Sequence, residues 1–168
     1  MPVNLELKIK LKSLNPVKKL LTAINAEYMG ILNQTDIYYK STDGLLKLRI
    51  ENGKESIIKY LRDEKNQDRF SNYQILEFSS GDAAGFFKDV LNIEAIVKKR
   101  RFLYMYNNTR IHLDSVRGLG YFLELETLVL NGKSDARKRF NEIFTLLKLG
   151  RYEQFKKSYR DLIMSKSK

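Results

Sequence analysis

The chain has 168 residues, 43% of them hydrophobic and 30% charged, and no cysteine; this fits one domain with a substantial core and excludes disulfides and thiolate chemistry. Its 31 basic and 20 acidic residues give a formal net charge of +11, which favours an anionic partner. No apolar run suits a signal peptide or a membrane span, so we expect a cytoplasmic protein with no membrane partner.

The N-terminal part predicts a strand followed by a helix. Residues 4–12 alternate charged and aliphatic side chains at period two, which is typical of a strand with one polar face. Asn15 and Pro16 are typical of a helix start. The core-facing stripe expected for this helix is Val17, Leu20, Leu21, Ile24, Tyr28 and Ile31.

Most of the remaining chain predicts strands joined by short turns. Seven further strands are expected, at residues 34–39, 45–51, 55–61, 73–78, 93–106, 109–114 and 121–129. The pair Asn52-Gly53 is a strong signal for a tight hairpin. Residues 63–71 are polar and predict a loop, and residues 82–91 predict a short helix.

The C-terminal part predicts a pair of helices. Ser134 is expected to cap the first, whose apolar stripe is Phe140, Ile143, Phe144 and Leu147. Gly150 interrupts the pattern. A second stripe then follows, at Tyr152, Phe155, Tyr159 and Leu162.

Charged residues recur on one face of strand after strand. For one strand, a face exposed to water is the commoner explanation. Repetition over several strands favours a sheet that curls until its charged faces meet, and about eight strands suit a small closed barrel. The predicted fold is therefore α+β, a closed eight-stranded antiparallel β-barrel or tunnel with a charged interior, flanked by helices. Charge carried on strands favours a compact polyphosphate ligand over nucleic acid.

Several motifs resemble one known family. Asn4-Leu-Glu6-Leu-Lys8 resembles the ExExK motif that opens the CYTH superfamily, the triphosphate tunnel metalloenzymes. The string at 112–126, HLDSVRGLGYFLELE, is similar to the class IV adenylyl cyclase branch. Further matches follow the family's order and make residues 1–168 a single CYTH-like domain; they lie at 34–39, 46–49, 97–101 and 158–162.

The resemblance implies a tunnel that binds ATP or another triphosphate and holds Mg²⁺ or Mn²⁺. The implied phosphate contacts are Lys8, Lys47, Arg49, Lys59, Arg62, Lys99 and Arg101. The implied metal ligands are Glu6, Glu124 and Glu126, with Asp114 as a ligand or a positioning group near the metal. Lys8, Arg101 and Asp114 are the implied catalytic residues. The residue types agree with these implied roles, because guanidinium and ammonium groups suit phosphate oxygens and carboxylates suit Mg²⁺.

Two local patterns have ordinary explanations that limit the site. Only alternate members of the basic run at 98–101 can point the same way, so we expect Lys99 and Arg101 to face inward and Lys98 and Arg100 to face solvent. His112 is the only histidine, which excludes a site with several histidines. We expect it to have a structural role in its strand rather than to act as a general base.

Asn4 stands where the family motif has its first glutamate, so metal binding is expected to be weaker. Three functions are considered. The first is an adenylyl cyclase that forms cyclic AMP and pyrophosphate from ATP. The second is a triphosphatase that hydrolyses inorganic, thiamine or nucleoside triphosphate, and the third is a non-catalytic nucleotide or polyphosphate binder. The sequence leaves the oligomeric state open, with a homodimer as one option.

Overall fold

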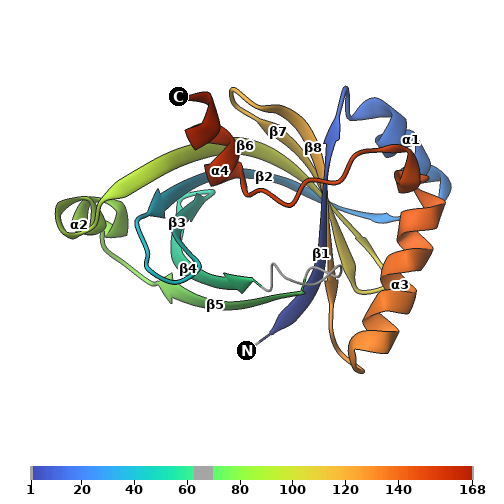
Figure 1. Cartoon of the computed structure of the whole chain (residues 1–168), viewed down its shortest axis with the longest axis horizontal. Coiled ribbons are helices and arrows are strands. Elements are labelled where there is room, and N and C mark those ends of the chain that lie inside the picture. The colour runs from blue at the N-terminus through green and yellow to red at the C-terminus, as the bar shows by residue number, and fades with distance from the viewer. Residues whose placement is uncertain (1, 63–69, 168) are drawn as a thin grey trace.

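The computed structural model describes residues 2–62 and 70–167, and over these residues it shows a closed antiparallel barrel of eight strands (Figure 1). In spatial order the strands are β1 (Val3–Leu11), β5 (Phe70–Phe78), β4 (Lys54–Arg62), β3 (Leu45–Glu51), β2 (Glu27–Tyr39), β6 (Ile93–Tyr106), β7 (Thr109–Val116) and β8 (Gly120–Leu128), which pairs with β1. The helices are α1 (Asn15–Ala23), α2 (Ala83–Val90), α3 (Lys133–Leu146) and α4 (Tyr159–Lys166), with a 3-10 turn η1 at Leu149–Arg151. The predicted fold class is confirmed.

The main hydrophobic core lies outside the barrel, between its wall and two helices. Figure 1 shows α1 and α3 on the side of the barrel that carries β1, β7 and β8. Aliphatic residues on the outer faces of these strands, such as Ile9, Leu113 and Leu125, are fully buried against helix residues that include Val17 and Ile143. Neighbouring side chains on a strand point to opposite faces. Because the aliphatic residues pack outward, the alternating charged residues point into the barrel.

The predicted hairpin turns are confirmed. Asn52 and Gly53 join β3 to β4 with φ of 48° and 82°, the left-handed pair that suits a two-residue hairpin. Asn107 and Asn108 do the same between β6 and β7, with φ of 44° and 56°. These turns set the registers that bring charged residues on adjacent strands level with one another.

The first helix is shorter than predicted. It ends at Ala23, and Asn25 then adopts a left-handed conformation with φ of 54°. Of the expected stripe positions beyond Ala23, Ile24 is the C-cap residue, and Tyr28 and Ile31 belong to β2, where Tyr28 packs on Tyr104 of β6 with ring centroids 5.0 Å apart. A helix would have left one edge of this half of β6 unpaired, because β7 covers only the other edge, so pairing with β6 overrides the helical spacing.

The C-terminal part also differs from the prediction. Gly132, not Ser134, is the residue that precedes α3. The second helix begins only at Tyr159, where Ser158 and Asp161 form a capping box. The chain from 152 to 158 instead crosses one end of the barrel (Figure 1), and the Phe155 backbone N–H donates to the Lys8 carbonyl at 2.8 Å.

The predicted loop at 63–71 lies mostly outside the described residues; only Phe70 and Ser71 are described, and both belong to β5. In the described parts of the chain, every helix is too short or too polar to cross a bilayer.

Candidate functional site

Eight of the predicted site residues line one chamber inside the barrel. Five carry positive charge and three are carboxylates, and they come from β1, β3, β6 and β8: Glu6, Lys8, Lys47, Arg49, Lys99, Arg101, Glu124 and Glu126. The space left between these side chains is small, about 40 Å³. The expected convergence of these side chains is therefore present.

Strand alternation explains which residues reach the chamber. On β6, Lys99 and Arg101 are only 6% and 4% exposed, whereas Lys98 and Arg100 face solvent, as predicted. Lys59 does not follow the prediction. It is exposed on the outer face of β4, while Tyr60 beside it lines the chamber, so the structure does not bring Lys59 to the chamber with the other predicted phosphate contacts. The strand was identified correctly, but the face was not.

Asp36 on β2 holds three of the cations in place. Its carboxylate accepts from Lys47 Nζ at 3.0 Å and from Lys99 Nζ at 2.6 Å. Arg49 donates to both of its oxygens, at 2.7 and 2.8 Å. Asp36 is fully buried; burial alone would raise its pKa, but Arg49, Lys47 and Lys99 hold the pKa well below its usual range.

The crowding of cations also affects the lysines. Burial and the neighbouring Arg49 lower the pKa of Lys47 well below its usual value, although Asp36 opposes the shift. For Lys99, burial is the largest cause, and the pKa falls to about 8. The chamber thus contains an ammonium group that loses its proton in mildly alkaline solution.

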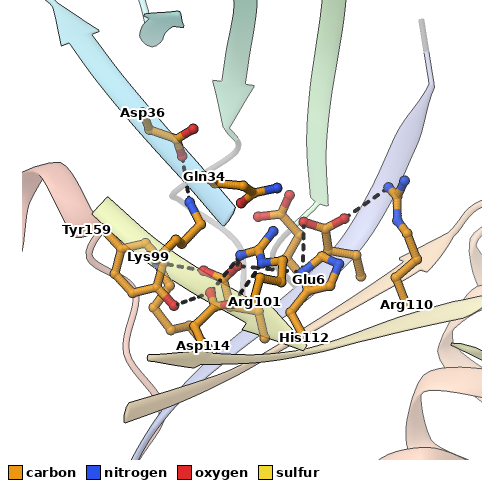
Figure 2. A network of polar contacts seen from close by, with 12 residues as sticks. Glu6, Gln34, Asp36, Lys99, Arg101, Arg110, His112, Asp114 and Tyr159 are labelled. Carbon is orange, nitrogen blue, oxygen red and sulfur yellow. Dashed lines mark hydrogen bonds and ion pairs between the residues drawn. The ribbon is translucent and has the colours of Figure 1, made fainter. Parts of the chain in front are cut away.

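A second group of ion pairs centres on Arg101 (Figure 2). Its guanidinium donates to both oxygens of Asp114, each at 2.7 Å, and to Glu124 at 2.6 Å. Tyr159 of α4 donates its hydroxyl to Asp114 at 2.8 Å, and Lys8 Nζ lies 3.7 Å from the centre of the Tyr159 ring. Lys8 also pairs with Glu124 at 3.0 Å.

These contacts separate the two roles expected for Asp114. The carboxylate is fully buried and is occupied by Arg101 and Tyr159, so its geometry favours positioning Arg101 over ligating a metal. Arg62, the last predicted phosphate contact, ends β4 opposite Ser71; its side chain lies outside the described part of the structure.

Sequence reasoning missed three residues of the site. Asp36 alternates with Gln34 and Tyr38, and this period could have placed it inside the barrel. Tyr159 carried no such signal, because it lies at the start of a helix that was predicted to pack on the core. His112 was assigned a structural role, yet it lies beside the acidic residues of β8.

The acidic side of the barrel suits a divalent cation. His112, Glu124 and Glu126 each offer one ligand atom, and these atoms lie within 4.8 Å of one another. Burial would raise the pKa of Glu124, but Lys8 and Arg101 hold it well below its usual value. Burial likewise opposes ionisation of Glu126, and His112 and Arg110 lower its pKa. Both carboxylates are therefore ionised at neutral pH, the form that binds metals.

Asn4 lies in a second chamber of about 260 Å³, which also reaches His112, Glu126, Arg49 and Arg101. The two chambers share Arg49, Arg101, Tyr60 and Glu126. The Asn4 amide is 2% exposed, and its Oδ1 has no hydrogen-bond partner among the described residues. This placement agrees with the expected position of residue 4 near the acidic group.

Comparison with known proteins gives consistent results. The family model described as the CYTH domain matches residues 3–159. A Methanocaldococcus jannaschii protein, named as a candidate adenylate cyclase, is 28% identical over an alignment of 181 positions that covers 95% of this chain and 98% of that protein. A solved structure from Pyrococcus horikoshii is 25% identical, covers 95% of this chain and 98% of that chain, and has a TM-score of 0.83.

A Hippeastrum protein, described as a candidate adenylyl cyclase with a dominant triphosphatase activity, is also similar in structure. It is 12% identical, covers 100% of this chain and 97% of that chain, and has a TM-score of 0.69. At this identity the likeness shows the fold alone.

Proposed function

The chain belongs to the CYTH domain family, and from this premise we propose that it is a metal-dependent enzyme that converts ATP to cyclic AMP and pyrophosphate. The observation that carries the proposal is the chamber itself, where five cationic side chains face three carboxylates inside a closed barrel. The name of the Methanocaldococcus jannaschii relative supports the choice of cyclase.

The cations would bind the triphosphate. Arg49 and Arg101 each present a guanidinium that already engages a carboxylate through two hydrogen bonds, the geometry that also suits two phosphate oxygens. Lys47 and Lys99 add point charges beside Arg49. Binding therefore exchanges internal ion pairs for pairs with phosphate, and Asp36 and Asp114 keep the cations in position until the ligand arrives.

Glu124, Glu126 and His112 would hold the divalent cation, and Glu6 lies opposite Glu126 in the register of β1 and β8. A divalent cation bound there supplies charge neutralisation at the phosphate oxygens. Lys8 links the cations that would bind phosphate to the residues that would hold the metal, because it pairs with Glu124 and lines the same chamber as the other cations.

In the proposed reaction the ribose 3′-hydroxyl oxygen forms a bond to the α-phosphorus as the bond from that phosphorus to the bridging β-phosphate oxygen breaks, and the departing pyrophosphate takes up the hydroxyl proton. Negative charge grows on the departing pyrophosphate, and Arg101, Arg49 and the lysines stabilise it. Positioning and charge stabilisation account for most of the catalysis in such a step, and both are provided by groups fixed in buried ion pairs.

A triphosphatase is the second candidate. The cationic side chains of the chamber all suit phosphate, and the aromatic residues that line it are Tyr38, Tyr60 and Tyr159, whose hydroxyl already donates to Asp114. A site that recognises phosphate and little else suits hydrolysis of a triphosphate by water. Fold alone does not decide between the two reactions.

Product analysis separates the candidates. The protein is incubated with ATP and Mg²⁺ or Mn²⁺, and the products are resolved by chromatography. Cyclic AMP with pyrophosphate is the expected result; ADP with phosphate would identify a triphosphatase. Intact ATP under every condition would contradict catalysis and leave a binder. Arg101→Ala is the control for a contaminating enzyme, because turnover that belongs to this chamber should fall with it.

A further inference from the structure

We propose that His112 is a direct ligand of the divalent cation, so that this site prefers transition-metal dications such as Co²⁺ and Zn²⁺ to Mg²⁺. The inference rests on the proposed function for placing a cation in the barrel, but its test requires no turnover.

The position of the imidazole supports a ligand role. His112 Nδ1 lies 3.8 Å from one oxygen of Glu124 and 3.8 Å from one oxygen of Glu126. Both distances exceed hydrogen-bond length. Two atoms that share a cation at about 2.1 Å each lie no more than about 4.2 Å apart, so these separations suit a shared ion better than a direct contact.

The surroundings of His112 leave its nitrogen without another partner. The residue is 4% exposed, and Nδ1 is a buried polar atom with no hydrogen-bond partner among the residues that the structure describes. Such atoms are rare in folded proteins, because burying a polar group without a hydrogen bond is unfavourable. A metal ion between the imidazole and the two carboxylates would satisfy it.

Neighbouring residues orient the carboxylates toward the imidazole. Arg110 pairs with Oε2 of Glu126 at 2.9 Å, and the other oxygen, Oε1, is the one that faces His112. Glu124 is held by Lys8 at Oε1 and by Arg101 at Oε2, the oxygen that faces His112, so a cation bound there would share this oxygen with Arg101 or displace it. Partners of this kind fix the geometry of metal ligands. Figure 2 shows His112 within this network, beside Arg101.

The donor set determines the preference for metals. Mg²⁺ favours oxygen ligands in octahedral geometry, whereas imidazole nitrogen suits Co²⁺, Zn²⁺ and related ions. Asn4 supports this view, because its unpartnered Oδ1 in the adjoining chamber offers a neutral oxygen where a glutamate would add negative charge. In a site with fewer negative charges and one nitrogen ligand, metal binding depends less on the electrostatic attraction between a hard cation and anionic oxygens.

The chain offers a direct test, because His112 is its only histidine. Full-length protein labelled with ¹⁵N-histidine gives imidazole signals that belong to this residue alone, and their couplings to the ring protons distinguish Nδ1 from Nε2. Addition of Zn²⁺ should shift the Nδ1 resonance strongly, and Mg²⁺ should leave it nearly unchanged. An Nδ1 resonance that does not respond to Zn²⁺ would overturn the proposal, whether or not the protein turns over ATP.

Calorimetric titration without nucleotide gives the second measurement. His112→Gln should weaken Co²⁺ binding by about tenfold or more and change Mg²⁺ binding by less than about twofold. Glu27→Gln, which alters an exposed carboxylate on β2, should bind both ions as wild type does. Equal Co²⁺ affinity in His112→Gln and wild type would refute the ligand role. If His112→Gln does not fold, the resonance measurement on wild-type protein decides alone.

Discussion

Asp36→Asn should destabilise the free protein and make it more dependent on its ligand. The substitution leaves Lys47, Arg49 and Lys99 without their shared counter-ion in a fully buried site. Removing one partner of a buried ion pair costs about 3–5 kcal/mol. Because the pKa of Lys99 is already about 8, its deprotonation relieves part of the repulsion, and we expect the lower end of this range. For a chain of this size, about 3 kcal/mol lowers Tm by roughly 6–12 °C.

Thermal unfolding followed by circular dichroism tests this expectation, with and without inorganic triphosphate. The added anion replaces the missing carboxylate, so triphosphate should raise Tm more in Asp36→Asn than in wild type. At a concentration of 100 times Kd the stabilisation is about 2.7 kcal/mol. Asp89→Asn, an exposed position on α2, is the matched control. The reasoning is refuted if Asp36→Asn melts like wild type, or if triphosphate stabilises the variant less than it stabilises wild type.

Three further predictions concern single residues of the chamber. Arg101→Ala should weaken ATP binding by roughly 1.5–3 kcal/mol in calorimetry, while Lys59→Ala on the outer face should change it little; the reverse order would place the ligand outside the barrel. Lys99 should lose its proton as pH rises through about 8, so triphosphate affinity should fall between pH 7 and 9.5; Lys99→Arg should flatten this dependence, and identical pH profiles would exclude Lys99 as a contact. Asn4→Glu should tighten Mn²⁺ binding, because it adds a carboxylate near the acidic group; melting curves that match wild type with and without Mn²⁺ would place residue 4 outside the metal site.

Much of the barrel could be predicted from local patterns. Alternation of charge and aliphatic residues identified strands such as β3 and β6 to the residue, and the Asn52-Gly53 turn fixed a register. The two-residue alternation also predicted correctly that Lys99 and Arg101 are the basic residues of β6 that point into the barrel. The prediction was wrong where two patterns competed. Tyr28 and Ile31 fit a helical stripe, and only the long-range pairing of β2 with β6 shows that they belong to a strand.

The parts of the site that could not be predicted depend on contacts between distant segments. Asp36 and Lys99 are 63 residues apart, and Tyr159 reaches Asp114 across 45 residues. Single-sequence patterns do not encode such pairs. The prediction placed Lys59 on the inner face of β4, but in the structure its neighbour Tyr60 points inward and Lys59 is exposed. This error is local to one strand. The role proposed for His112 depends on its cross-strand partner Glu124, a pairing that the registers of β7 and β8 establish.

The central claim, that the cationic chamber binds a triphosphate, is tested most directly by titrating the protein with ATP and with AMP in a calorimeter. Wild type should bind ATP at one site per chain and AMP at least about tenfold more weakly, because the β- and γ-phosphates provide most of the charge-assisted contacts. The double variant Arg49→Ala/Arg101→Ala should lose this preference, whereas Lys156→Ala, an exposed position in the segment 152–158, should retain it. Equal affinity of wild type for ATP and AMP, or undiminished ATP binding in the double variant, would contradict the account.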